Sequence, residues 1–302
     1  MSFERTIAPK GTRVFKLLAY PLLWIFSTLP FYAINGLSNG IYFIVYKLLK
    51  YRIKVVRTNL ENAFPNRSES ERLIIEKAFY KHLSDLFLET IKLITVSRSE
   101  INKRVINVHQ GLYDDYNAKN QSVMVVMSHC GNWEWICVAS SAQCQQQIQC
   151  VYKSLSSPGW DWLMYKLRSK FGTNPFTMEQ TLRAMAKNRD ITTINAFVGD
   201  QNPSSGATAY WTTFLNQETA FLQGPEKISK RFNLPVVYLA TTKTKRGHYA
   251  FTSKVLTEDP NSLHEGELTE MIVRETEAEI LNQPEIWLWS HRRWKHKKDI
   301  HS

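Results

Sequence analysis

The chain has 302 residues, of which 43% are hydrophobic, and it carries a formal net charge of +11. This composition excludes a chain too polar to fold, because it supplies the apolar side chains for one large domain or two small ones. A surface this basic suits nucleic acid, anionic lipid or an acidic protein partner. Four cysteines lie within residues 130–150 and form no C-x-x-C pair, so we expect reduced thiols and neither a metal site nor a cofactor.

The first predicted element is an apolar stretch at residues 14–32, in which Lys16 is the one charged residue. Pro21 and Pro30 interrupt it, so it falls short of the roughly 20 consecutive apolar residues of a clean transmembrane helix. A second apolar stretch follows at residues 41–49. Basic residues flank both stretches, namely Arg5, Lys10, Arg13, Lys47, Lys50, Arg52, Lys54 and Arg57.

These features favour a helical hairpin or tilted helix that lies partly in one leaflet of a membrane. We therefore predict that residues 1–50 form an N-terminal hydrophobic helical segment that associates with a membrane from its cytoplasmic side. A pair of buried core helices is the alternative interpretation.

Residues 54–94 have apolar side chains at three- and four-residue spacing, which is typical of helices. Pro65 and Asn66 break this pattern into two helices. The sequence SESE at residues 68–71 predicts a capping box at the start of the second helix. A long amphipathic helix is then expected to continue to residue 94.

From residue 122 the pattern changes to short strands that alternate with helices. Strands are predicted at residues 122–128, 147–153, 191–200, 234–244 and 248–256, and helices at residues 158–172, 180–188, 224–233 and 262–283. This alternation predicts an α/β fold with a mixed, largely parallel sheet flanked by helices. We assign residues 51–302 to this domain.

The sequence SHCGNWEW at residues 128–135 stands where the first buried strand ends. Catalytic groups of open α/β sheets lie beyond the carboxyl ends of strands, and His129 falls at such an end. Gly131 and Asn132 supply a tight turn and a helix N-cap. Glu134 follows in the first helical turn, where it could fix the tautomer of the imidazole while His129 takes up a proton. For so short a pattern, a purely structural role of both residues is the alternative.

The sequence SHCGNWEW resembles the H-x-x-x-x-[D/E] signature of the glycerolipid and lysophospholipid acyltransferases. It looks most like the lauroyl/myristoyl acyltransferases of bacterial lipid A biosynthesis. Further blocks are similar to the same family, namely residues 51–66, 151–172, 199–239 and the closing sequence WLWSHRRWK at residues 287–295. The resemblance therefore covers roughly residues 51–295.

The resemblance implies transfer of an acyl chain from a thioester, on acyl carrier protein or coenzyme A, to a hydroxyl of a lipid acceptor. His129 would be the general base, oriented and charge-stabilised by Glu134. Backbone N–H groups of Gly131 and Asn132, at a helix start, are candidates for the oxyanion hole. A covalent mechanism through Cys130 is disfavoured, because sequence neighbours at a strand end point to opposite sides.

The resemblance also implies three groups of acceptor-binding residues. Arg168 would bind an anionic acceptor, since a guanidinium fork matches phosphate. Asp200 and Gln201, in the turn DQNPSSG, would shape the acceptor pocket. Glu226 resembles the Pro-Glu-Gly position of the wider superfamily, although Gly, Pro and Glu come in a different order here.

The basic sequence at residues 290–298 could contact nucleic acid, anionic headgroups or an acidic carrier protein. We expect membrane phospholipids or the carrier and no nucleic acid, because apolar N-terminal segments do not suit a DNA-binding protein. Together with these features, the family resemblance implies acylation of a lipid A precursor at the cytoplasmic face of the bacterial inner membrane. An acyltransferase of the same fold for another glycolipid or aminolipid, and a non-enzymatic basic lipid- or nucleic-acid-binding protein, remain as alternatives.

Overall fold

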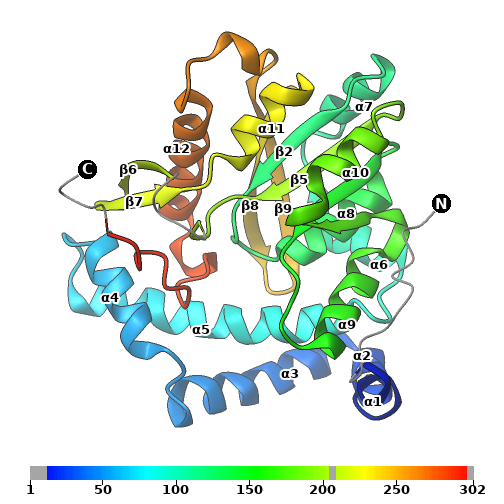
Figure 1. The fold of residues 1–302 in the computed structure, drawn as a ribbon. Coiled ribbons are helices and arrows are strands. Elements are labelled where there is room, and N and C mark those ends of the chain that lie inside the picture. The colour runs from blue at the N-terminus through cyan, green and yellow to red at the C-terminus, as the bar shows by residue number, and fades with distance from the viewer. Residues whose placement is uncertain (1–11, 204–208, 298–302) are drawn as a thin grey trace.

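The computed structural model of the protein describes residues 12–203 and 209–297 (Figure 1). Among the residues singled out above, Arg5, Lys10 and Lys298 lie outside the described ranges, as does the Ser-Ser-Gly part of the predicted turn.

A seven-stranded sheet forms the centre of the molecule, in the order β1-β9-β8-β2-β5-β3-β4. All neighbouring strands are parallel except the β8–β9 pair, which is antiparallel. This confirms the predicted mixed, largely parallel sheet. The strands are β1 Val105–Asn107, β2 Val123–Met127, β3 Gln147–Tyr152, β4 Asn174–Thr177, β5 Thr193–Val198, β8 Val236–Lys245 and β9 His248–Thr257.

Strand β2 lies in the middle of this sheet, between β8 and β5, and all five of its residues are buried. Val125 and Met127 face one apolar cluster, with Trp135 and Leu163. Met124 and Val126 face another, with Met185 and Ile272. A strand buried on both faces needs apolar residues at every position, which explains its unbroken hydrophobic run.

Helices therefore cover both faces of the sheet. The first cluster includes side chains of α6 Arg98–Arg104, α7 Gln110–Ala118, α8 Trp133–Gln143 and α9 Pro158–Arg168. The second includes side chains of α10 Thr181–Lys187, α11 Gly224–Phe232 and α12 Glu267–Asn282. A separate antiparallel hairpin, β6 Tyr210–Phe214 and β7 Gln217–Phe221, packs beside α12 (Figure 1).

Helix α5, Glu69–Lys92, crosses below the sheet, preceded by α4, Ile53–Ala63 (Figure 1). Its N-cap Ser68 accepts a hydrogen bond from the N–H of Glu71, whose carboxylate accepts from the Ser68 N–H, so the predicted capping box is confirmed. The helix buries several polar and charged side chains, namely Glu76, His82, Ser84, Asp85, Glu89 and Lys92. A buried face this polar indicates that α5 takes part in hydrogen-bond networks.

The N-terminal residues form two helical arms that are bent by 120° at residues 29–30. The first arm comprises α1 Thr12–Val14, η1 Phe15–Ala19 and α2 Tyr20–Thr28, and the second α3 Phe31–Tyr42 and η2 Phe43–Leu48. Both arms pack on α5: Lys92 Nζ donates to the carbonyl oxygens of Ser27 and Leu29, each at 2.7 Å, and Ser38 donates to Asp85 at 2.7 Å. The predicted division at residue 50 stays a prediction.

Within the described residues, no single helix has the length and apolar composition needed to cross a membrane. The two arms taken together pass that test by length and composition.

Three short 3-10 turns complete the elements before the C-terminal part: η3 Lys170–Gly172, η4 Met178–Gln180 and η5 Pro260–Ser262. After α12 the chain forms η6, Pro284–Ile286, and continues without regular structure. We call residues 284–294 the closing segment. It runs back toward the carboxyl end of β2, where the Gly131 N–H donates to the Ile286 carbonyl oxygen at 3.0 Å.

Candidate active site

His129 and Asp200 meet at the carboxyl ends of two neighbouring strands. His129 lies two residues beyond Met127 of β2, and Asp200 two residues beyond Val198 of β5, the residue paired with Met127. His129 Nδ1 lies 2.5 Å from Asp200 Oδ1, and the His129 backbone N–H donates to Asp200 Oδ2 at 3.1 Å. Two contacts to one carboxylate fix both the position and the ring orientation of the imidazole.

The carboxylate of Asp200 is buried, with 2% of its side chain exposed. Burial works against its ionisation, but the charge of His129 and the hydrogen bonds from His129 and Trp287 hold the pKa of Asp200 well below its usual range. Asp200 is therefore an acceptor only, and the proton between it and His129 belongs to the imidazole Nδ1.

The other imidazole nitrogen is left as an acceptor in the neutral ring. Gln201 Nε2 lies 3.1 Å from His129 Nε2 and donates to it in this tautomer. The ring also packs edge-to-face on Trp133, with centroids 4.8 Å apart. The tautomer is thus the one that a general base needs, with a lone pair on Nε2.

Glu134 does not supply the partner of His129 that the sequence suggested. Both of its carboxylate oxygens bind the guanidinium of Arg168, at 2.8 Å to Nε and 2.5 Å to Nη2. One of them also accepts from Trp133 Nε1 at 3.2 Å. In the first turn of α8, Glu134 is directed toward α9, whereas Asp200 reaches His129 from the adjacent strand. The expected His129–Glu134 contact is therefore corrected to His129–Asp200.

Arg168 was expected to present its fork to an anionic acceptor, but Glu134 occupies that fork from one side. Burial alone would lower the pKa of Arg168, yet the Glu134 carboxylate raises it above the normal value. The ring of Tyr152 lies 5.2 Å from the guanidinium carbon. Arg168 and Glu134 thus form an ion pair in which the Glu134 side chain is buried and the Arg168 side chain is 17% exposed.

The turn after the histidine requires glycine. Gly131 has φ = +60°, and a Cβ there would lie 2.5 Å from Thr241 Cγ2. Its N–H already donates to the Ile286 carbonyl oxygen, so Gly131 supplies no oxyanion donor in this conformation. This corrects one of the two oxyanion candidates.

Asn132 caps α8, as the sequence suggested, by accepting the Trp135 N–H at 3.0 Å. Its side-chain amide donates to Glu89 Oε2 at 2.8 Å, which ties the turn to helix α5. Both the oxygen and the nitrogen of the Asn132 side chain are therefore engaged, and its backbone N–H is the candidate that we keep for oxyanion binding.

Cys130 lies in the interior, and burial raises the pKa of its thiol well above the ordinary value. A buried thiol that resists ionisation is a poor nucleophile, so the covalent alternative loses support. All four cysteines are free, as expected for reduced thiols.

Glu226 is buried in α11 and serves the start of α12. Its two oxygens accept from the N–H groups of Gly266 and Thr269, at 2.8 and 3.0 Å, and from the Thr269 hydroxyl at 2.5 Å. Lys230 adds an ion pair at 3.2 Å. With its acceptor sites used in this way, Glu226 is a structural cap rather than the acceptor ligand that the sequence suggested.

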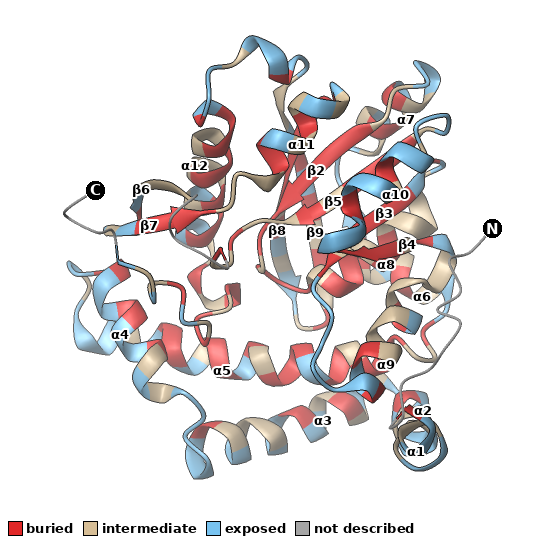
Figure 2. Ribbon diagram, viewed as in Figure 1, coloured by how far each residue is buried: buried red, intermediate tan, exposed pale blue. Residues whose placement is uncertain are grey.

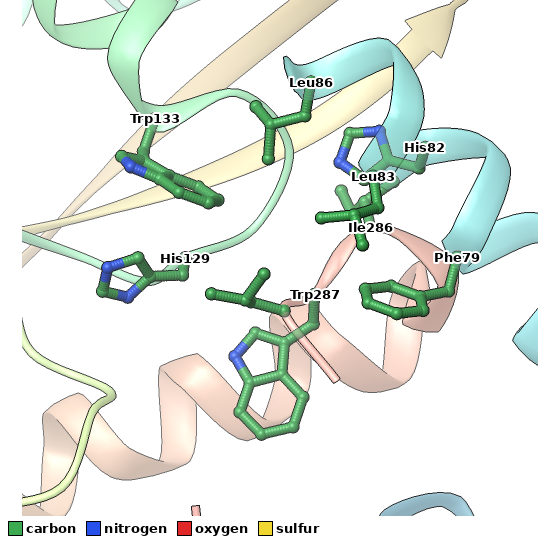
Figure 3. A pocket seen from close by; sticks show the side chains of 9 residues that line it. Phe79, His82, Leu83, Leu86, His129, Trp133, Ile286 and Trp287 are labelled. Carbon is green, nitrogen blue, oxygen red and sulfur yellow. The ribbon is translucent and has the colours of Figure 1, made fainter. Parts of the chain in front are cut away.

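A shallow apolar hollow lies beside His129, and in this conformation it has no room for a water molecule (Figure 3). The side chains around it come from α5, from the turn after β2, from the start of α8 and from the closing segment. They are Phe79, His82, Leu83, Leu86, His129, Trp133, Ile286, Trp287 and Leu288. Burial and the charge of Lys243 lower the pKa of His82 to about 3, so the hollow is lined by a neutral second histidine.

Three further buried residues support this site, and the sequence analysis missed all of them. Trp287 Nε1 donates to Asp200 Oδ2 at 2.7 Å. Glu89 holds Asn132, and Glu279 accepts from the Ser128 hydroxyl at 2.7 Å. The closing block of the family resemblance pointed to residues 287–295, but nothing in the sequence indicated which side chains they contact.

The C-terminal basic sequence is not a free arm within residues 290–297. Arg293 is 1% exposed; its Nη1 donates to Asn202 Oδ1 at 3.0 Å and its Nη2 to the Ala220 carbonyl oxygen at 2.8 Å. Its expected role at an anionic surface is therefore corrected to a structural one, whereas Arg292, Lys295 and Lys297 are exposed.

The family model described as "Bacterial lipid A biosynthesis acyltransferase" matches residues 8–296. No curated protein matches the chain.

Proposed function

Because the chain belongs to the bacterial lipid A biosynthesis acyltransferase family, we propose that it acylates a lipid A precursor with His129 as the general base. The acyltransferase activity follows from the family; the residue roles, the acyl donor and the membrane site are our proposal. The observation that carries it is the His129–Asp200 pair at the carboxyl end of β2.

In the proposed reaction, His129 Nε2 removes the proton from the acceptor hydroxyl. The hydroxyl oxygen attacks the thioester carbonyl carbon, and Asp200 stabilises the imidazolium that forms. The tetrahedral intermediate then collapses, the C–S bond breaks, and the proton passes from Nε2 to the leaving thiolate. The Gln201 amide, which occupies Nε2 in the free protein, has to give way to the hydroxyl.

Glu134 remains part of the proposed site, although it does not contact His129 directly and acts through its neighbours. Its bidentate pair with Arg168 and its bond to Trp133 Nε1 hold the indole against the imidazole. We assign to this pair the positioning of Trp133 and, on its open side, the binding of an anionic group of the acceptor by Arg168.

The donor is proposed to be acyl-acyl carrier protein, with acyl-CoA as the second candidate. The apolar side chains beside His129, among them Leu83, Leu86 and Ile286, support a site where the first carbons of an acyl chain lie next to the base once these side chains move apart. The backbone N–H of Asn132 is the remaining candidate for the oxyanion of the thioester carbonyl.

Attachment to the cytoplasmic face of the inner membrane is supported by the two N-terminal arms. Both arms have many exposed residues, drawn in pale blue in Figure 2. The exposed large apolar side chains include Leu17, Leu18, Leu22, Trp24, Ile25, Phe26, Tyr32, Phe43, Ile44 and Leu48. The sequence contains no Asp or Glu from residue 5 to residue 60. An apolar face with basic and no acidic neighbours matches an anionic leaflet.

Vesicle binding tests this attachment. The full chain should co-sediment with vesicles that contain phosphatidylglycerol, and Lys47→Gln with Lys50→Gln should weaken binding by roughly fivefold per charge. Lys254→Gln, which removes an exposed lysine of β9 paired with Glu275, is the matched control and should bind like the wild type. Equal binding of all forms to neutral and anionic vesicles would contradict the proposal.

His129→Ala tests the base. We expect acyl transfer in purified membranes to fall by at least about 10²–10⁴-fold while the circular dichroism spectrum is retained. Unchanged transfer would remove His129 from its assigned role. Lipid mass spectrometry of cells that lack the protein identifies the acceptor, since lipid A lighter by one acyl group supports the proposal and an altered aminolipid supports the alternative.

A further inference from the structure

The closing segment crosses the catalytic turn and forms part of its backbone pairing. Besides the Gly131–Ile286 hydrogen bond, an isolated antiparallel β-bridge joins Cys130 to Trp287. The side chain of Trp287 is therefore placed at the carboxyl end of β2 by main-chain contacts and lies beside His129 (Figure 3). It is 2% exposed.

The indole of Trp287 supplies the third hydrogen bond to Asp200. Its Nε1–H donates to Oδ2 at 2.7 Å, the same oxygen that accepts the His129 backbone N–H, while Oδ1 faces the imidazole. The indole itself is held in an aromatic cluster, with Trp289 at 4.7 Å and 90°, Trp294 at 6.0 Å and Phe214 at 6.1 Å. A donor this rigid fixes the plane of the carboxylate.

We propose that Trp287 is a positioning residue for acyl transfer, which orients Asp200 and reduces the negative charge that Asp200 presents to His129. This inference rests on the proposed function, because it assigns Trp287 a role through the His129–Asp200 pair. A hydrogen bond donated to Oδ2 withdraws charge from the carboxylate. Without it, Asp200 would hold the imidazolium more tightly, and less neutral His129 would be present at a given pH.

The other charged groups around Asp200 and His129 have to be considered for any pH effect. In the closing segment, burial lowers the pKa of His291 to about 4 and that of Arg293 to about 10. Burial raises the pKa of Glu279, in α12, to about 7, and the charge of Asp200 adds to this rise. The thiol of Cys130 stays neutral, as does His82 of α5, and Glu134 is paired with Arg168.

Among these neighbouring groups, Glu279 is thus the one that is expected to change charge between pH 5 and 9. The titration of Glu279 is common to the wild type, Trp287→Phe and Trp289→Phe, so it cancels when these three proteins are compared.

Trp287→Phe removes the N–H and keeps a buried aromatic ring. We expect the acid limb of the kcat/KM pH profile, and the midpoint of the His129 imidazole ¹⁵N titration, to move upward by about half to one pH unit. Trp289→Phe is the matched control, because Trp289 is equally buried in the same cluster and its indole donates to the Pro284 carbonyl oxygen. Its profile and titration should coincide with those of the wild type.

Coinciding titrations of Trp287→Phe and Trp289→Phe would overturn the inference. The ¹⁵N titration does not require acyl transfer, so it answers this question even if His129→Ala retains activity and the proposed base is wrong. Conversely, if His129→Ala is inactive while Trp287→Phe titrates like the wild type, the proposed function stands and the role of Trp287 is lost.

If Trp287→Phe does not fold, Asp200→Asn tests the hydrogen bond on which the inference rests, with Trp287 in place. An amide oxygen is a weaker acceptor than a carboxylate. The indole N–H resonance of Trp287 should therefore shift in Asp200→Asn while that of Trp289 stays; an unshifted Trp287 resonance would contradict the inference.

Discussion

Two buried carboxyl groups hold consecutive residues at the end of β2, and their environments differ. The Asp200 carboxylate accepts two hydrogen bonds from His129, one from the imidazole and one from the backbone N–H. Glu279 contacts Ser128 and accepts from its hydroxyl at 2.7 Å, from the Tyr238 hydroxyl at 2.6 Å and from the Thr241 N–H at 2.6 Å. Burial raises the pKa of Glu279 to about 7, whereas the pKa of Asp200 lies below its usual range.

The difference shows that the partner, rather than burial, decides the charge of a carboxyl group in this protein. Three neutral donors do not offset the burial of Glu279, but an imidazole that can become a cation does so for Asp200. Asp200 is therefore equipped to stabilise a positive charge during a reaction. Glu279 is equipped to hold β2, β8 and α12 together.

The largest expected effect contrasts the two carboxyl groups directly. Asp200→Asn should lower kcat by about 10³–10⁴-fold, because an amide can stabilise neither the required tautomer nor the imidazolium. Glu279→Gln should keep kcat within about tenfold of the wild type. Acyl-transfer kinetics with purified protein measure both; equal losses would mean that the two groups do not differ in function.

A third buried carboxylate, that of Glu134, has a permanently charged partner, the guanidinium of Arg168. Glu134→Ala leaves the guanidinium of Arg168, a side chain that is 17% exposed, without its counter-ion, so we expect a loss of about 2–3 kcal/mol in the free energy of unfolding, below the roughly 3–5 kcal/mol of a fully buried pair. The double variant Glu134→Ala/Arg168→Met should recover much of this loss. Urea unfolding measures both, and a single variant as stable as the wild type would contradict the assigned ion pair.

The pH dependence of stability separates Glu279 from Asp200. The carboxyl group of Glu279 has a pKa of about 7 in the folded protein, compared with an ordinary value of 4.5. Between these values the folded state binds the proton and the unfolded state does not. Its contribution to stability is thus complete below about pH 4.5 and is lost as the pH rises through 7.

The wild type should therefore lose roughly 2–3 kcal/mol relative to Glu279→Gln between pH 4.5 and 8. The difference between the two proteins has to be measured, because His82 contributes the opposite slope: burial lowers its pKa, and its stabilising effect is lost as the pH falls below about 6.5. Parallel stability curves for the two proteins would show that Glu279 titrates normally.

The smallest effect concerns a single neutral donor. Ser128→Ala removes the hydroxyl that Glu279 accepts from and should cost about 1 kcal/mol of unfolding free energy, with kcat unchanged within about twofold. Ser84→Ala is a matched control, since Ser84 is also buried but donates to the Tyr80 carbonyl oxygen within α5. If Ser128→Ala lost much of its kcat and Ser84→Ala did not, Glu279 would have a catalytic role like that of Asp200.

Much of the fold could be predicted from the sequence because its signals are local. The unbroken apolar run of β2 and the capping residues of α5 determine structure within a few positions. The β6–β7 hairpin was missed for a physical reason: Leu215 and Asn216 both adopt positive φ at its turn, with values of 49° and 62°. Leucine rarely takes this conformation, so the sequence contains no ordinary hairpin signal there.

The sequence predicted where the candidate site lies, but it did not predict which carboxylate pairs with His129. His129 and Asp200 were each placed at a strand end, yet the choice of partner depends on which strands are neighbours. That order is set by the packing of the whole sheet, and local periodicity does not contain it. Glu134 is closer to His129 in sequence than Asp200 is, but its carboxylate is bound by Arg168 on α9. Likewise, the role of Trp287 depends on a chain reversal after α12.

The closing segment also has a consequence for the order in which the protein is made. A ribosome completes β2, β5 and the residues His129 and Asp200 long before it reaches Ile286 and Trp287. A nascent or truncated chain that stops before residue 286 leaves the Gly131 N–H without its carbonyl acceptor and Asp200 without its indole donor. We therefore expect unfinished chains to be incompetent for acyl transfer, so that activity begins only after translation has passed this point.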